Sequence, residues 1–173
     1  MPELIIHIDW TGPFTLPEVK SFTSLTLDFG LYQIYAHHPV YSRNLVYIGR
    51  ARSRTFGVRI SEHRWDTGSE NDPAKVEVYL GRLKAEAIPT LEEQKTHIEL
   101  AEALLIHAHA PAYNTQYGMR SPAASAHSNV RVLNWGAVRS VHREVSGLMW
   151  TAAAETFKLY KPYDRQLTKP ISN

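Results

Sequence analysis

Residues 30–51 read GLYQIYAHHPVYSRNLVYIGRA and contain two runs typical of β-strands. Residues 30–36 and 45–48 are rich in the β-branched and aromatic residues that favour strands. Between them, residues 37–44 contain the turn-forming residues Pro, Ser and Asn. The pattern predicts a β-hairpin with a long loop from His37 to Asn44.

Further strands are expected on both sides of this hairpin. Residues 75–80 (KVEVYL) alternate apolar and polar side chains as a half-buried strand does. Residues 4–8 (LIIHI) and 130–135 (VRVLNW) are short apolar runs that are candidates for extra strands.

Three helices are predicted. The first covers about residues 55–64. The second begins at the capping box Thr90-Leu91-Glu92-Glu93 and ends near His109, because Pro111 cannot continue a helix. The third is expected within residues 138–160.

The composition favours one compact domain. The chain has 173 residues and no cysteine, which excludes disulfides and thiolate zinc sites and fits a cytoplasmic protein. The first ten residues contain acids and no Lys or Arg, unlike a secretory signal. No apolar run approaches the roughly 18 residues of a membrane span, so no membrane partner is expected.

Positive charge is concentrated behind the hairpin. Residues 43–64 contain six arginines against Glu62 alone, a local formal charge of +5, which leaves about −3 for the rest of the chain. Such a segment on a nearly neutral protein can be a solvated surface, or it can bind a polyanion such as nucleic acid.

Several single residues are ambiguous when taken alone. Glu102 falls at the margin of the apolar stripe of the second helix, where a carboxylate costs desolvation energy unless a cation pairs with it. Arg59 and His63 are four residues apart and share a helix face. Tyr32 and Tyr47 lie on adjacent strands. Glu102 can instead be a solvated acid, and Arg59 and His63 a surface pair. The two tyrosines can simply pack in the core.

Together these positions resemble the GIY-YIG nuclease superfamily. The elements are Gly30-Leu31-Tyr32, Tyr47-Ile48-Gly49, Arg59-x-x-x-His63, and Glu102 followed by Pro111 and Asn114. The resemblance covers residues 30–114. The first motif has Leu for Ile, and fourteen residues separate the two tyrosines, more than is usual in the family.

The resemblance implies an α/β (α+β) fold, a small three-stranded antiparallel sheet flanked by helices. Residues 30–114 would form the nuclease core. Residues 1–29 would be an N-terminal extension packed on that core. Residues 115–173 would be a C-terminal extension, a strand plus a helix, of the same compact domain.

The resemblance also implies metal-dependent hydrolysis of a DNA phosphodiester. Mg²⁺ or Mn²⁺ would bind Glu102, and Arg59 would stabilise the transition state. Tyr32 would be the general base, provided that nearby positive charge lowers its pKa from about 10. Supporting catalytic roles are expected for Tyr47, His63 and Asn114.

DNA contacts are expected from the arginines and the hairpin loop. The phosphate-binding set is Arg43, Arg50, Arg52, Arg54 and Arg64, and the loop with Tyr41, Arg43 and Asn44 would read base edges. The short flanks indicate a restriction-type enzyme that acts as a homodimer on DNA. A non-specific or repair-type nuclease and a non-cleaving nucleic-acid-binding module stay open as alternatives.

Overall fold

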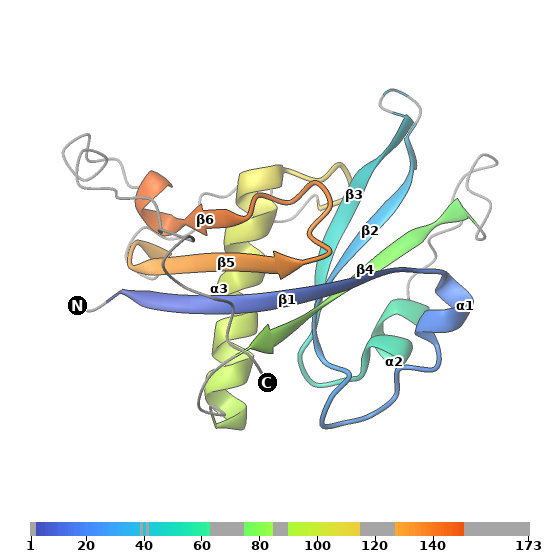
Figure 1. The fold of residues 1–173 in the computed structure, drawn as a ribbon, viewed down its shortest axis with the longest axis horizontal. Coiled ribbons are helices and arrows are strands. Elements are labelled where there is room, and N and C mark those ends of the chain that lie inside the picture. The colour runs from blue at the N-terminus through green and yellow to red at the C-terminus, as the bar shows by residue number, and fades with distance from the viewer. Residues whose placement is uncertain are drawn as a thin grey trace.

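In the computed structural model, six strands form one sheet in the order β3-β2-β4-β1-β5-β6 (Figure 1). Residues 3–38, 40, 42–62, 75–84, 90–114 and 127–150 are described. The strands are β1 (Leu4–Phe14), β2 (Gly30–His38), β3 (Ser42–Ala51), β4 (Glu77–Lys84), β5 (Val130–Gly136) and β6 (Glu144–Ser146). The helices within these ranges are α1 (Leu16–Val19), α2 (Phe56–Ser61) and α3 (Leu91–His109), with a 3-10 turn η2 (Gly147–Trp150).

This architecture corrects the expected fold. A small three-stranded antiparallel sheet is wrong, because the sheet has six strands and mixed pairing. β2 pairs antiparallel with β3 and β4, but β1 lies between β4 and β5, antiparallel to the first and parallel to the second. The strands within residues 4–8 and 130–135 are confirmed. Their apolar runs predict a strand but carry no information on which neighbour it pairs with.

The sheet is strongly curled. β1, β5 and β6 cross the direction of β2 and β3 steeply, so that the sheet forms a half-barrel (Figure 1). Register shifts interrupt β1 between Thr11 and Phe14 and β2 between Ile34 and Tyr35, and such irregularities increase local bending.

Two hydrophobic cores lie on opposite faces of the sheet. Alternate residues of β1 and residues of α3 build the first, with Ile8, Trp10, Ile98 and Leu105 among its buried members. The second lies under α2, where side chains of β2, β3 and β4 pack around Phe56 and Ile60. The strands between the cores are therefore covered by α3 on one face and by α2 on the other.

The long loop expected from His37 to Asn44 is also wrong. β2 continues to His38 and β3 begins at Ser42, which pair with each other. Backbone pairing needs no apolar side chain, so the strands extend through a polar stretch that reads as a loop. Pro39 and Tyr41 lie outside the described residues.

The helix predictions have mixed outcomes. The capping box at Thr90 and the helix end at His109 are confirmed, and α2 begins after Thr55 as expected. A helix within residues 138–160 is wrong as far as Trp150, where a turn, β6 and η2 are found instead. Val138, Val141 and Val145 have helical spacing in the sequence, but they are buried from irregular structure and from β6. Residues 151–160 are outside the described ranges.

Candidate active site

The two tyrosines of the hairpin lie together over Gly49. Tyr32 on β2 is directly opposite Gly49 on β3, and Tyr47 shares this face of the sheet. The two rings stack with centroids 6.0 Å apart. A Cβ atom on Gly49 would lie 2.5 Å from atoms of both rings. A side chain at position 49 would therefore displace the tyrosines, which gives this glycine a physical role.

Glu102 is buried on α3 and pairs with a cation from β3. Only 6% of the residue is exposed, and the guanidinium of Arg50 donates to Oε2 of its carboxylate. The expectation that an acid at the margin of the apolar stripe needs a cationic partner is confirmed. Glu99, one helical turn earlier, lies 3.6 Å from the same guanidinium and also pairs with Arg52.

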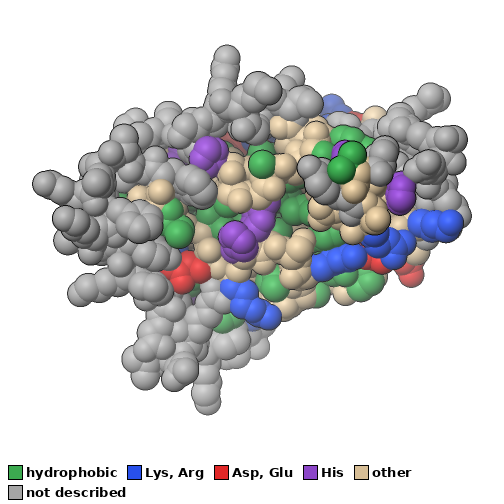
Figure 2. Space-filling view, turned by 90° about the horizontal axis from the view of Figure 1, so that it is seen from above, with side chains coloured by type: hydrophobic (Ala, Val, Ile, Leu, Met, Phe, Trp, Pro, Cys, Tyr) green, Lys and Arg blue, Asp and Glu red, His purple; other side chains and the backbone are tan. Residues whose placement is uncertain are grey.

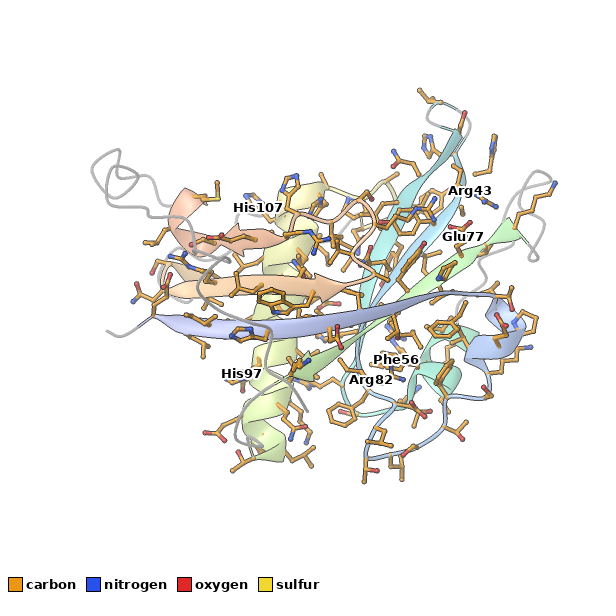
Figure 3. All side chains as sticks on the ribbon, viewed as in Figure 1. Arg43, Phe56, Glu77, Arg82, His97 and His107 are labelled. Carbon is orange, nitrogen blue, oxygen red and sulfur yellow. The ribbon has the colours of Figure 1, made fainter. Side chains whose placement is uncertain are left out.

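Arg59 is positioned by α2 and the segment before β2. The backbone N–H groups of Phe56 and Gly57 donate to carbonyls of that segment, at Asp28 and Phe22. Arg82 fastens the same region, since its guanidinium lies 5.4 Å from the centre of the Phe56 ring and binds the Asp28 carboxylate at 2.9 Å (Figure 3). These contacts fix the helix that carries Arg59.

Tyr32, Tyr47, Arg59 and Glu102 come from four different elements and act on one another electrostatically. Arg59 lowers the pKa of both tyrosines and of Glu102, whereas Glu102 raises the pKa of both tyrosines. Because β3 is the edge strand, a side chain of α3 can reach Tyr47 around that edge.

Burial dominates the ionisation of this cluster. It is the largest cause that raises the pKa of Tyr32, Tyr47 and Glu102 above their usual values. Arg59 acts on Tyr32 in the expected direction, but burial outweighs it, so the pKa of Tyr32 is raised rather than lowered. Tyr32 is completely buried, while Tyr47 is only half-buried.

The arginines behind Gly49 border a charged hollow of about 240 Å³. Its described lining residues are Arg50, Arg52, Ser53, Arg54, Arg59 and Glu62. Glu62 pairs with Arg54 and lies 3.2 Å from Arg59. The four arginines thus face three carboxylates, those of Glu62, Glu99 and Glu102, which leaves a formal charge of about +1 around the hollow.

Glu62 and Glu99 are the two site residues that sequence reasoning missed. Both are ordinary helix formers, and Glu99 was indistinguishable from a solvated acid. A usable signal did exist, because Glu99 is three residues before Glu102 and shares its helix face.

Asn114 is structural. Its side-chain oxygen accepts from the N–H of Ile48 at 2.9 Å, and its NH₂ group donates to the Ile48 carbonyl at 2.7 Å. The N–H of Tyr113 donates to the Val46 carbonyl at 2.9 Å. The segment after α3 thereby satisfies the outer edge of β3.

Other predicted residues lie elsewhere. Arg43 is near the tip of the β2–β3 hairpin, where it pairs with Glu77 at 2.7 Å and donates to the Lys75 carbonyl (Figure 3). It is seven residues along β3 from Arg50, about 23 Å at the rise of a strand. His63 and Arg64 lie outside the described residues.

The donor set fits a metal ion held mainly by water. The described residues contain no group of three or more His, Cys, Asp or Glu side chains placed to share a metal. Mg²⁺ commonly binds one or two carboxylates and keeps several waters. Glu102 offers a carboxylate, and among the described contacts Arg50 engages one of its two oxygens.

No helix in the described ranges is long and apolar enough to cross a membrane.

Comparisons with known proteins identify no relative. No protein-family model matches the chain, and no curated protein or solved structure is significantly similar to it. The candidate site therefore depends on its own geometry.

Gly49→Ala should disturb the tyrosine pair and destabilise the fold. The added methyl group overlaps both rings, so we expect a loss of about 1–3 kcal/mol in the free energy of unfolding, measured by urea denaturation. In a Tyr47→Leu background the same substitution should cost less, because one of the two clashes is gone. Equal costs in both backgrounds would contradict the stacked arrangement over Gly49.

Glu102→Gln should stabilise the protein at neutral pH. Burial raises the pKa of Glu102, so the folded state disfavours the ionised form more than the unfolded state does. This acid therefore lowers wild-type stability as pH rises above its unfolded value of about 4.5. The stability gain of Glu102→Gln should be present at pH 7.5 and absent at pH 4, as measured by urea midpoints. A variant less stable than wild type at pH 7.5 would show that the Arg50 ion pair outweighs burial.

Proposed function

We propose that the chain is a metal-dependent endonuclease of the GIY-YIG type that hydrolyses DNA phosphodiester bonds. The observation that carries this proposal is the stacked pair of Tyr32 and Tyr47 over Gly49, on whose pKa values the charges of Arg59 and Glu102 both act. These residues are up to 70 positions apart in the chain. They are the same residues that the motif resemblance selects.

The charged hollow beside this cluster supports a phosphodiester substrate. Its arginine side chains can bind phosphate oxygens, and guanidinium groups aimed at a phosphoryl centre stabilise the charge that develops in the transition state. Arg59 is the arginine that also acts on both tyrosines and Glu102. We assign it the transition-state role, and we assign Arg50, Arg52 and Arg54 to phosphate binding.

Glu102 is the proposed ligand of Mg²⁺ or Mn²⁺. When bound, such an ion supplies charge stabilisation and lowers the pKa of a coordinated water. Arg50 occupies one oxygen of Glu102, so it must share or leave the carboxylate when a cation binds. A phosphate in the charged hollow offers Arg50 a new partner that is negatively charged, as the Glu102 carboxylate is.

Tyr47 is the better placed of the two tyrosines to accept a proton from water, because part of it is exposed while Tyr32 is completely buried. The ring of Tyr32 stacks on that of Tyr47, with centroids 6.0 Å apart, and supports it from the buried side. Since the charge of Glu102 raises the pKa of Tyr47, neutralising that charge shifts this pKa downward. The protonation of Tyr47 is thus coupled to the occupancy of Glu102.

The products of cleavage distinguish the remaining alternatives. A two-fold dimer would leave double-strand ends at one short palindromic site. A monomer would leave nicks without sequence preference, as a non-specific or repair-type nuclease does. A protein that binds DNA without cutting it would be a non-cleaving module. Sequencing the ends of plasmid fragments after incubation with Mg²⁺ separates the three.

Glu102→Gln should abolish cleavage and preserve DNA binding. The amide is a poor metal ligand, whereas the arginines of the charged hollow are unchanged. We expect no detectable plasmid cleavage with Mg²⁺ or Mn²⁺ and a dissociation constant within about threefold of wild type, measured by fluorescence anisotropy at fixed salt. Cleavage at the wild-type rate would remove Glu102 from the metal site.

Arg59→Ala should reduce the cleavage rate by about 10²–10³-fold, as expected for a donor aimed at the transition state. The matched control is Arg143→Ala, which removes the same charge from an exposed position on the turn before β6. The control should cut within about twofold of wild type, since Arg143 is exposed and not among the described lining residues of the charged hollow. Equal effects of the two substitutions in single-turnover assays would mean that Arg59 contributes only to the overall charge.

A further inference from the structure

A second hollow, of about 230 Å³, lies along β3 from the charged one. β3 contributes Asn44, Leu45 and Val46 to it. The end of α3 and the segment after it contribute His109, Ala110 and Ala112, and the remaining described lining residues are His38 and Ser140. We call it the histidine hollow. Figure 2 views this side of the molecule from above, with histidine side chains across the middle of the face and arginine and lysine side chains along its lower margin.

The histidine hollow is chemically unlike the charged hollow. None of its described lining residues is Lys, Arg, Asp or Glu. It therefore lacks the cations that bind phosphate, and its polar side chains suit a neutral ligand. Its mixture of apolar and polar lining is typical of a site that receives a ring system and orients it with a few hydrogen bonds.

Two of its side chains present hydrogen-bond donors. The Asn44 oxygen accepts from the N–H of Leu45 at 2.8 Å, so the NH₂ group of that side chain is available to donate. His109 Nε2 accepts from the N–H of His142 at 3.1 Å. Burial lowers the pKa of His109 to about 4, so the ring is neutral at pH 7 and its proton is on Nδ1, a donor.

The hydroxyl of Ser140 is engaged within the protein. Its oxygen lies 2.6 Å from the hydroxyl of Tyr35, which donates to the side-chain oxygen of Gln33 at 2.8 Å. The single Tyr35 proton is thereby used, so Ser140 donates to Tyr35. The hollow therefore offers a ligand the donors of Asn44 and His109, beside the ring of His38, whose Nδ1 accepts from the N–H of Val40 at 3.2 Å.

Two acceptors side by side are the major-groove pattern of guanine, with O6 and N7, and of no other base. An aromatic surface lies nearby, since Tyr113 is 42% exposed and its ring centre is 6.3 Å from that of His38. Exposed aromatic rings of this kind stack on bases.

The two hollows are a few base pairs apart on the scale of DNA. Val46 borders the histidine hollow and Arg50 the charged one, and four residues of strand separate them by about 13 Å. That length corresponds to about four base-pair steps at 3.4 Å each.

We propose that the histidine hollow is a base-recognition subsite in which Asn44 and His109 bind the O6/N7 edge of a guanine about four base pairs from the cleaved phosphate. This inference rests on the proposed nuclease function and adds the chemical basis of its sequence preference.

Asn44→Asp tests the subsite. Asp keeps the acceptor for the Leu45 N–H but replaces the NH₂ donor with an acceptor that repels guanine O6 and N7. The matched control is Ser42→Asp, which adds the same charge at an exposed position on β3 outside the described lining. Each substitution is made once in the wild-type background and once in the Glu102→Gln background. The variants in the wild-type background cut a randomised DNA library with Mg²⁺, and the ends of the fragments are sequenced. The variants in the Glu102→Gln background select sequences from the same library by binding.

We expect wild type and Ser42→Asp to enrich a guanine at one position about four base pairs from the cut, and Asn44→Asp to lose that preference by about tenfold or more. The binding selection should change in the same way without any cleavage. Unchanged base preferences in Asn44→Asp, with cleavage intact, would overturn the subsite alone. If wild type binds DNA but does not cut it, the nuclease proposal is overturned. The binding selection then tests the subsite by itself, and an unchanged guanine preference in Asn44→Asp would overturn it. Neither cleavage nor binding would overturn both.

Discussion

The outer edge of β3 is the constraint on which the candidate site depends. An edge strand leaves a row of backbone N–H and C=O groups without a strand partner, and burying such groups unpaired is costly. Asn114 solves this by donating to and accepting from Ile48 with one side-chain amide. Because Asn114 follows α3 by only five residues, the same contacts hold the helix end against β3. Glu102 is thereby brought to Arg50 and to the tyrosines.

Opposing effects act on the pKa values of Glu102 and the two tyrosines where α3 meets β3. Burial raises the pKa of Glu102 and of both tyrosines, while the arginines act in the opposite direction. Such clusters are poor choices for stability alone, since a buried ion pair rarely recovers its desolvation cost. Strongly shifted groups that converge from separate elements are instead typical of functional sites. The same opposition couples Glu102 to Tyr47, because a ligand that neutralises Glu102 also lowers the pKa of Tyr47.

In the proposed function, the two hollows along β3 would have separate roles in DNA recognition. The charged hollow carries guanidinium groups that suit phosphates, and the histidine hollow carries neutral donors that suit a base edge. DNA-binding proteins separate these tasks in the same way, with phosphate contacts for position and base contacts for specificity. One strand that borders both hollows keeps them at a fixed distance, which is what reading a sequence near a cut requires.

Much of the local structure could be predicted from the sequence. The hairpin strands, the capping box at Thr90 and the marginal position of Glu102 depend on neighbouring residues and on helical or strand periodicity. The helix expected after Val138 failed for the same reason that others succeeded. Valines at helical spacing also occur in a turn and a strand, and periodicity alone cannot separate the two. The order of the sheet was equally hidden, because β1 pairs with strands more than 60 positions away.

The sequence by itself determined the two hairpin strands, the strands near residues 4–8 and 130–135, and the helix from Thr90 to His109, and it marked the tyrosines, Arg59 and Glu102 as a set. Only the tertiary structure decided that six strands share one sheet and that Arg50, 52 residues away, is the partner of Glu102. It also decided that Glu62 and Glu99 balance the arginines and that burial raises the tyrosine pKa values. The physical reason is the distance along the chain over which each interaction acts. Propensity and capping act over a few residues, whereas desolvation and ion pairing depend on groups that only the folded chain brings into contact.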